Sequence, residues 1–463
     1  MSKFPTENER ARSAEIKKNK LLYKGKFQSV LPFFTEASST VRQNRREPIV
    51  NLTGMATDIF ADFMFRNSPE VNSPEEYLKE IIDIFTNSKL ATKLWSAAVG
   101  QSYGGFTALE VRIKNGSAFI DVLQPENVFP RYGDDGELES VRVVTVSEVG
   151  GLPVLKIKKH TIGEIEYSVQ YYGGKLDGQM TNPRTLWNVE GITNLRESTE
   201  NEIVEIEDTG LNQIPVFLVQ NKDIDGNLGV SDYDDLISIL DEYTSLNSQI
   251  STQLKKHANS KIAVPEGTLD EKGRMKDSQD VFEVTTATDG EQMIVPQYIT
   301  NSNPQLDQAI KNRQDVLSDF SRVSQVALEL IDAAQRGGVE KVGALRTRIF
   351  KTLAKVDRKL KAFTPAITGA LALAYNWQTA EGSTVVSADE ISVNYKSGLP
   401  VDEVEQTTIQ VQRIGAGIQT TKDAIRTLDG LEGDALAQKV QEIDEAARSA
   451  LGVSVTPAPT VTL

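Results

Sequence analysis

The sequence predicts an α+β fold in which helical and strand-rich regions follow one another along the chain. Apolar residues first recur every three or four positions, then alternate with a period of two from about residue 106 to residue 219, and then return to helical spacing. A chain of 463 residues is too long for one ordinary core, so about three structural regions are expected.

Two amphipathic helices are predicted before the strand-rich region, behind a charged arm at residues 1–20. In PIVNLTGMATDIFADFMFRNSPEV, helical recurrence of apolar residues continues until an Asn-Ser-Pro sequence ends it. The second helix, PEEYLKEIIDIFTNSKLATKLWSAAVGQSYGG, starts with acidic residues behind Ser73 and Pro74, as the helix dipole favours, and ends at paired glycines.

The middle region is predicted to be a mainly antiparallel β structure. Segments such as TALEVRI, AFIDVL and SVRVVTV alternate apolar and polar residues, and the turn pairs Asn115-Gly116 and Asp135-Gly136 separate strands. The acidic insertion NLRESTENEIVEIEDTG is interpreted as a solvated loop.

The C-terminal half is predicted to hold two long helices, at 231–260 and 304–334, with a small module of short strands at 261–303 between them. Ser231 can cap the first of these helices. The apolar stripe of that helix consists of Leu236, Leu240, Tyr243, Ile250 and Leu254.

A further long helix at 345–386 has the strongest periodicity in the chain. Its apolar seam, together with the residues just before it, consists of Val342, Leu345, Ile349, Leu353, Val356 and Leu360. Such a narrow seam predicts burial against a neighbouring element along the whole helix. The other faces carry basic residues with almost no acids, including Arg346, Arg348, Lys351 and Lys355. These basic residues fit a solvated or salt-bridged face, a contact with a neighbouring subunit, or a contact with DNA.

The composition excludes several classes of protein. Fifty Lys and Arg against 65 Asp and Glu give a net charge of -15, which argues against a general nucleic-acid coat or a protein that binds anionic membranes. The chain has no cysteine, so disulfides, Cys-based zinc sites and thiol catalysis are excluded. Neither a secretory signal nor a membrane-spanning run of apolar residues is expected.

The glycine-containing stretch RGGVEKVGALRTR resembles a phosphate-binding loop only superficially. Gly338 and Gly343 have the right separation, but Ala344 and Leu345 stand where a P-loop needs Lys followed by Ser or Thr. The preceding segment also has a helical pattern, whereas the P-loop follows a buried strand. A connection between two helices is therefore the better interpretation of this stretch.

No catalytic residue and no cofactor is predicted. His160 and His257 have no recognisable acidic partner nearby, and both are interpreted as surface residues. Asp223, Asp225 and Asn227 form a weak candidate for a calcium loop, but its turn glycine is misplaced and Asp234 stands where a closing Glu is needed. We expect a polar turn there.

Several passages, in order, resemble the portal proteins of tailed bacteriophages. REPIVNLTGMATDIFADFMF resembles the early wing helix of that family, and IDVLQPENVFPRYGDDGELESV is similar to its wing strands. IPVFLVQNKDIDGNLGVSDYDDLISILDEYTSLNSQIS is the most specific passage and resembles the start of the first stem helix. GALRTRIFKTLAKVDRKLKAF resembles the long helix after the family's tunnel loop.

The resemblance implies a portal-protein fold with a β-rich wing, a long α-helical stem, a small α/β clip and a helical crown. The expected regions are a charged arm at 1–20, the wing at 21–230, stem helices at 231–260 and 304–334, the clip at 261–303, the tunnel loop at 335–344, a long helix at 345–386, the crown at 387–450 and a disordered tail at 451–463. The tunnel-loop residues expected near DNA are Gln335, Arg336, Gly337, Gly338, Lys341 and Gly343.

The resemblance also implies a function and partners. It implies a dodecameric ring at the capsid vertex, through which double-stranded DNA is packaged and ejected. The terminase large subunit, a head-tail adaptor, and the major capsid and scaffolding proteins would be its partners. Its location would be the virion, and the host cytoplasm during assembly. The alternative is a metal- or carboxylate-dependent hydrolase with a helical oligomerisation arm, which would need a catalytic constellation around the β region.

Overall fold

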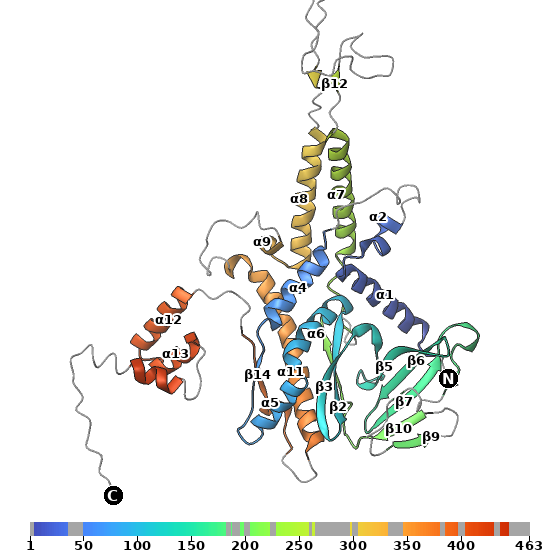
Figure 1. The fold of residues 1–463 in the computed structure, drawn as a ribbon, viewed down its shortest axis with the longest axis vertical. Helices are drawn as coiled ribbons and strands as arrows, with labels where there is room; N and C mark the ends of the chain where they lie inside the picture. Colours follow the sequence, from blue (N-terminus) through green and yellow to red (C-terminus); the bar gives the residue numbers. More distant parts are fainter. Residues whose placement is uncertain are drawn as a thin grey trace, which may run out of the picture. The chain divides into compact units, whose positions relative to one another are not determined.

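The helices and strands of the chain fall into two units in the computed structural model (Figure 1). The structure describes residues 4–35, 50–181, 187, 195–198, 204–222, 228–258, 262–263, 297–298, 304–331, 346–379, 385–396, 403–429 and 436–443. The first unit comprises Met1–Arg336 and Ile349–Gly398, and the second comprises Gly337–Arg348 and Leu399–Leu463. Over these described ranges, no helix is long and apolar enough to cross a membrane.

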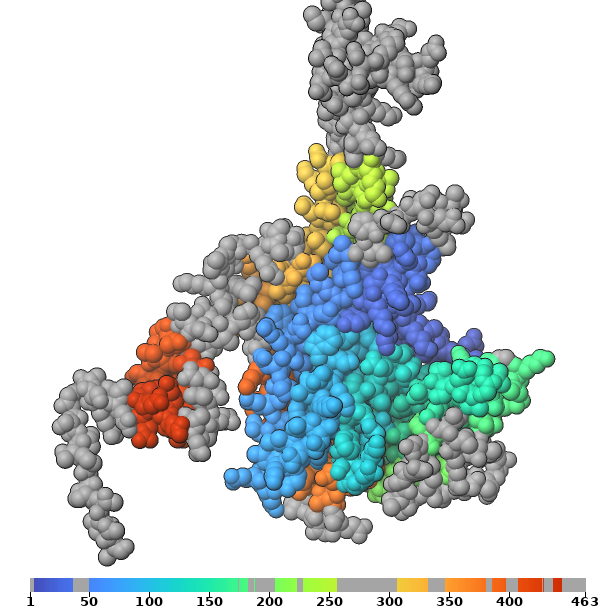
Figure 2. All heavy atoms as spheres, in the orientation of Figure 1, coloured from blue at the N-terminus to red at the C-terminus, as the bar shows by residue number. Residues whose placement is uncertain are grey.

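The N-terminal helices contribute much of the core of the first unit. They are α1 (Glu7–Tyr23), α2 (Pro32–Thr35), α4 (Leu52–Phe65), α5 (Leu78–Asn87) and α6 (Leu90–Gly104). Helix α1 begins at a capping box formed by Thr6 and Glu9, and it buries Ile16 and Leu22 in the main core. The residues predicted as a charged arm therefore contain a packed helix, which contacts α4 and α6. In Figure 2 these N-terminal residues, in dark blue, lie against the lighter blue and cyan surface of the residues that follow.

The long helix predicted after Ser73 is in fact two helices. The break between α5 and α6 falls at Lys89, whose φ of 55° is a left-handed conformation that a continuous helix excludes. Ser88 beside it is buried, and its hydroxyl accepts a hydrogen bond from the Ile120 amide of strand β3 at 2.9 Å. The apolar periodicity continued across this break, so the sequence pattern did not reveal it.

A three-stranded antiparallel sheet lies at the centre of the first unit. Its order is β11 (Val216–Gln220), β2 (Phe106–Lys114) and β3 (Ser117–Leu123). Helices α6 and α11 (Phe350–Gln378) pack against it. The residues from Phe106 to Val111 are all buried, and because successive residues point to opposite faces, both faces of β2 are covered. The predicted turn at Asn115-Gly116 is confirmed, since both residues have positive φ as a tight hairpin requires.

A seven-stranded sheet forms the second β layer, and its described pairings are all antiparallel. Its order is β4 (Val128–Tyr132), β5 (Leu138–Val149), β6 (Leu152–His160), β7 (Glu164–Tyr171), β10 (Val204–Asp208) and β9 (Leu195–Ser198), with β8 (Met180–Thr181) pairing to β7. The antiparallel β prediction is thus confirmed. The acidic insertion is not a loop throughout, because it supplies β9 and β10, and Glu205 in β10 is buried.

Two long helices pair beyond the central sheet. Helix α7 (Ile237–Ala258) packs against α8 (Pro304–Ser324), and the described residues between them form two short antiparallel strands, β12 (Ile262–Ala263) and β13 (Gln297–Tyr298). The predicted stripe of α7 is buried as far as Ile250, but Leu254 is exposed. The chain forms turns from Asp232 to Leu236, so this helix begins later than predicted.

The second predicted long helix also ends early. Gln325 has a φ of 63°, which stops α8 at Ser324, and the short helix α9 (Leu328–Ile331) follows. The Gln325 carbonyl accepts a hydrogen bond from the Thr352 hydroxyl at 3.0 Å, which helps to hold the backbone in this conformation. The prediction of a helix continuing to residue 334 is therefore wrong at this point.

The end of the chain is divided between the units. Strand β14 (Ser392–Asn394), which follows the short helical turn Ala388–Glu390, pairs with β1 (Glu70–Asn72) in the first unit. The first residues of the expected crown, from 387, therefore belong to the first unit, which extends to Gly398. The second unit contains α12 (Glu403–Gly415), α13 (Thr421–Asp429) and helical residues at 436–443.

A close backbone contact joins the end of α6 to the segment before α7. The Gly105 carbonyl accepts a hydrogen bond from the Asn221 amide at 2.8 Å. A Cβ placed on Gly105 would lie 2.3 Å from the Gly229 carbonyl oxygen, and one placed on Gly229 would lie 2.1 Å from the Gly105 carbonyl oxygen. Only glycine fits at either position without backbone movement.

This contact gives a prediction with a matched control. Gly105→Ala should lower the free energy of unfolding by about 2–4 kcal/mol, because it adds a steric clash to the penalty for positive φ. Gly116→Ala also has positive φ, but no atom lies within 4 Å of a Cβ placed there, so it should cost only about 1 kcal/mol. Urea unfolding of both variants measures the difference, and equal midpoints would contradict the steric argument.

Candidate functional site

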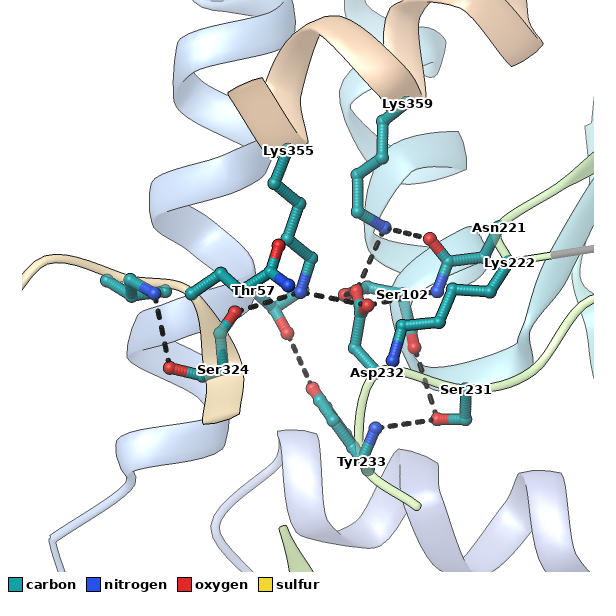
Figure 3. Close-up of polar contacts among 12 residues, drawn as sticks. Thr57, Ser102, Asn221, Lys222, Ser231, Asp232, Tyr233, Ser324, Lys355 and Lys359 are labelled. Atoms are coloured by element: carbon teal, nitrogen blue, oxygen red, sulfur yellow. Dashed lines mark hydrogen bonds and ion pairs between the residues drawn. The ribbon is translucent and has the colours of Figure 1, made fainter. Parts of the chain in front are cut away.

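A buried charged cluster lies where several parts of the first unit meet (Figure 3). Its anion is Asp232, in the turn before α7, and its cations are Lys355 and Lys359 on α11. The two lysines are four residues apart, so they lie on one face of the helix. Ser102 on α6 and Asn221 after β11 complete the cluster from two further elements.

Both oxygens of Asp232 are occupied. Lys355 Nζ lies 3.0 Å from Oδ1 and Lys359 Nζ lies 2.9 Å from Oδ2. The Ser102 hydroxyl donates to Oδ2 at 2.5 Å, and the Asn221 amide group donates to Oδ1 at 3.0 Å. The side chain of Asp232 is only 4% exposed, so the carboxylate depends on these four donors in place of water.

Each ammonium group has further acceptors. Lys355 Nζ donates to the Ser324 carbonyl at the end of α8 at 3.0 Å, and it lies 4.3 Å from the centre of the Phe60 ring. Lys359 Nζ donates to Asn221 Oδ1 at 2.6 Å and to Gln101 Oε1 at 3.3 Å. The cluster therefore links α11 to α6, α8, the end of β11 and the turn before α7 at once.

The residues beside Asp232 hold the turn in place. The Ser231 hydroxyl donates to the Ser102 carbonyl at 3.2 Å and accepts from the Tyr233 amide at 3.1 Å. The Tyr233 hydroxyl lies 2.7 Å from the Thr57 hydroxyl of α4. Ser231, which was predicted to cap a helix, instead anchors this turn to the last turn of α6.

The electrostatics of the cluster follow from one anion being shared by two cations. Burial alone would raise the pKa of Asp232, but the charges of Lys355 and Lys359 and the hydrogen bonds from Asn221 and Ser102 hold its pKa below the usual range. Burial lowers the pKa of Lys359 to about 8, because Asp232 only partly offsets the loss of water and Lys355 repels it. Burial lowers the pKa of Lys355 in the same way.

A second buried cluster joins the two sheets. Glu110 on β2 contacts Lys158 on β6, and its Oε1 lies 3.1 Å from His160 Nε2. Burial alone would raise the pKa of Glu110, but the charge of Lys158 and the contact with His160 hold its pKa below the usual range. Burial lowers the pKa of His160. The prediction that His160 is a surface residue is wrong, because its side chain is 0% exposed at the junction between the sheets.

The predicted site residues have different outcomes. Arg346, Arg348 and Lys351 are exposed, whereas Lys355 is buried beside Asp232 and does not belong to an exposed basic face. In the predicted seam, Ile349 and Val356 are buried, and Leu353 and Leu360 are partly buried. The remaining predicted residues lie outside the described residues: Gln335, Arg336, Gly337, Gly338, Lys341, Val342, Gly343, Leu345, Asp223, Asp225 and Asn227.

The chemistry of the charged clusters is structural. The ionisable groups of the Asp232 cluster are buried and bonded to one another, which suits fixing the position of α11 better than binding a substrate. Within the part of the chain that the structure describes, no group of three or more His, Cys, Asp or Glu side chains is placed to hold a metal ion. Sequence reasoning missed Asp232, Lys359 and Ser102 as members of one site.

The sharing of Asp232 predicts unequal effects of mutation. Asp232→Asn should lower the free energy of unfolding by about 3–5 kcal/mol, because it leaves two buried ammonium groups without an anion. Lys359→Met should cost less, about 1–2 kcal/mol, because a neutral Asp232–Lys355 pair remains. Urea unfolding followed by tryptophan fluorescence measures both variants. Asp235→Asn, at a side chain that is 73% exposed, is the control and should leave the midpoint unchanged.

A pH dependence follows from Lys359. The folded chain releases this proton near pH 8 and the unfolded chain near pH 10.5, so the unfolded chain binds more protons between these values. The free energy of unfolding of the wild type, relative to Lys359→Met, should therefore rise by up to about 3 kcal/mol across this window. Urea midpoints at pH 7.5 and 9.5 test the sign, and a relative fall at the higher pH would contradict it.

The sequence matches the protein family described as "Phage portal protein, SPP1 Gp6-like" over residues 3–451. A comparison with curated protein sequences finds no match.

Similar solved structures come from gene transfer agent (GTA) particles. A chain in the structure of the virion of a native particle is 14% identical to this chain, with a TM-score of 0.40, and the match covers 81% of this chain and 89% of that chain. The neck of an empty particle, computed with C6 symmetry, gives 14% identity, a TM-score of 0.46, and coverage of 85% and 93%.

The neck of a native GTA particle, computed with C12 symmetry, gives 12% identity and a TM-score of 0.41, with coverage of 82% of this chain and 89% of that chain. The family match spans nearly all of the 463 residues, and it confirms the resemblance that the wing and stem passages indicated. The chain belongs to the family of SPP1 Gp6-like phage portal proteins.

Proposed function

We propose that this chain forms the ring at a phage capsid vertex through which double-stranded DNA is packaged and ejected. The observation that carries the proposal is the family match over residues 3–451. The paired helices α7 and α8 fit a stem, since both are long and each leaves polar residues exposed along its length. In the same assignment, residues 21–230 form the wing, 261–303 the clip and 387–450 the crown.

The proposed assembly is a closed ring of twelve copies. A ring needs a head-to-tail contact in which two different surfaces of each subunit meet, so some surface groups of the isolated chain must become buried. Leu254 on α7 and Val323 on α8 are large apolar side chains that are 51% and 42% exposed. Phe350 at the start of α11 is 67% exposed. Burial of these residues against neighbouring subunits would explain their exposure in a single chain.

The proposed DNA contact is sparse. Counterion release makes every lysine or arginine bound to phosphate add to affinity, so a bore with many such contacts would hold DNA and oppose sliding. A net charge of -15 suits passage of DNA better. We assign residues 335–344 to the tunnel loop, with Arg336 and Lys341 as its phosphate contacts. Arg346 and Lys351, both exposed, are assigned to the same path or to a neighbouring subunit.

The remaining partners follow from the position of the ring. The proposed clip would bind the terminase large subunit during packaging and a head-tail adaptor afterwards, and the wing would meet the major capsid and scaffolding proteins. The protein would act in the virion and, during assembly, in the host cytoplasm. A metal-dependent hydrolase would need a metal site, and none of the described His, Cys, Asp or Glu side chains form a group of three or more that could hold a metal ion.

The first test is the mass and symmetry of the purified protein. Native mass spectrometry and class averages of stained particles should show a closed ring of about twelve copies with a central opening, formed without nucleotide. A small compact oligomer without an opening would contradict the proposal.

Deletion of residues 336–343 tests the proposed tunnel loop. The shortened chain should still form the ring in the same assays, but it should package less DNA in a packaging assay with its motor. Loss of the ring would mean that this segment is structural.

A further inference from the structure

The Asp232 cluster lies between the two ends of one chain segment. The described part of the first unit ends at Ile331 and resumes at Ile349. We call residues 321–331 the outgoing end and residues 349–360 the returning end. The cluster contacts both ends, and it also contacts the turn that precedes α7.

The outgoing and returning ends are bonded directly to each other. The Thr352 hydroxyl accepts from the Ala327 amide at 2.9 Å and donates to the Gln325 carbonyl at 3.0 Å. The Arg358 guanidinium donates to Gln325 Oε1 at 2.5 Å. Thr352 is 0% exposed, so its two hydrogen bonds are not replaced by water. These hydrogen bonds therefore hold the two ends together.

Lys355 is the residue that extends this connection to α7. Its ammonium donates to the Ser324 carbonyl on the outgoing end and lies 3.0 Å from Asp232 Oδ1 in the turn before α7. Its own backbone belongs to the returning end. Lys359 pairs with the same carboxylate and is equally buried, but its other partners are Asn221 and Gln101, which do not belong to the outgoing end.

We propose that Lys355 is a positioning residue that couples both ends of the segment to the start of α7, so that they open and move together. Within the charged cluster the coupling passes through one ammonium group, because that group alone among the cluster members touches Ser324 and Asp232 at once. The direct packing of α8 against α7 is a separate contact that the Lys355 and Lys359 variants leave in place. The inference rests on the proposed function for its meaning, since the segment contains the proposed tunnel loop and α7 is the proposed stem helix. A displacement of the loop would then reach the stem through Asp232.

The test is a double-mutant cycle read by hydrogen–deuterium exchange of the full chain. Thr352→Val loosens the outgoing end. In the wild-type background it should raise exchange about tenfold at residues 321–327 and also at 236–242 in α7, because exchange reports local opening. In a Lys355→Met background, the rise at 236–242 should disappear while the rise at 321–327 remains. In a Lys359→Met background, both rises should remain.

Lys359→Met is the matched control because it removes an equally buried charge from the same carboxylate. Strands β5 to β7 serve as the internal reference, and their exchange should not change in any variant. If Thr352→Val disturbs this reference, Arg358→Gln, which breaks only the contact with Gln325, replaces it as the perturbation. The inference would be overturned if Thr352→Val did not raise exchange in α7. It would also be overturned if the rise in α7 were equally large in the Lys355→Met background.

The two proposals fail separately. The exchange experiment needs only the folded chain. If Thr352→Val raises exchange in α7 as expected but the protein forms no ring, the proposed function is wrong and the coupling stands. If the protein forms a ring with the expected symmetry but the rise in exchange caused by Thr352→Val is confined to residues 321–327, the coupling is wrong and the proposed function stands.

Discussion

The fold of the first unit depends on one buried carboxylate, Asp232, that is shared by two lysines of α11. Apolar contacts alone would let α11 slide or rotate on the central sheet, because they have little directional preference. Two ammonium groups one helical turn apart fit one carboxylate in only one register. Removal of three charges from water costs several kcal/mol for each ion, and the hydrogen bonds from Ser102 and Asn221 and to Ser324 offset that cost. The cluster thus gives the junction its specificity more than its stability.

The same arrangement occurs at the other junction of the first unit. Glu110 on the central sheet is placed between Lys158 and His160 on the seven-stranded sheet, as Asp232 is placed between Lys355 and Lys359. In both cases a carboxylate from one structural element meets two basic groups from a single partner element. A sheet or helix that carries two basic groups on one face can approach the carboxylate in only one orientation, and this fixes how the layers stack.

Much of the local structure could be predicted from sequence, whereas the sites could not. The hairpin at Asn115-Gly116 and the antiparallel strands depend on neighbouring residues, so turn chemistry and alternation revealed them. The break at Gln325 could not be foreseen, because it depends on Thr352 in a different helix. Lys355 was predicted to belong to a basic face that is solvated, salt-bridged or in contact with a partner, and its buried ion pair with Asp232 could not be foreseen for a similar reason. Periodicity shows which side of a helix is apolar, but not that a carboxylate more than a hundred positions away will meet a lysine beside that side.

The contact between Gly105 and Gly229 has a consequence for how related sequences can diverge. Each glycine leaves space for the other's carbonyl oxygen, so any other residue at either position would have to be accommodated by moving two backbones apart. Those backbones belong to the end of α6 and to the segment leading to Asp232, and both contribute to the charged cluster. Substitution at one glycine would therefore need compensating changes at distant codons, so we expect this pair to change rarely among related sequences.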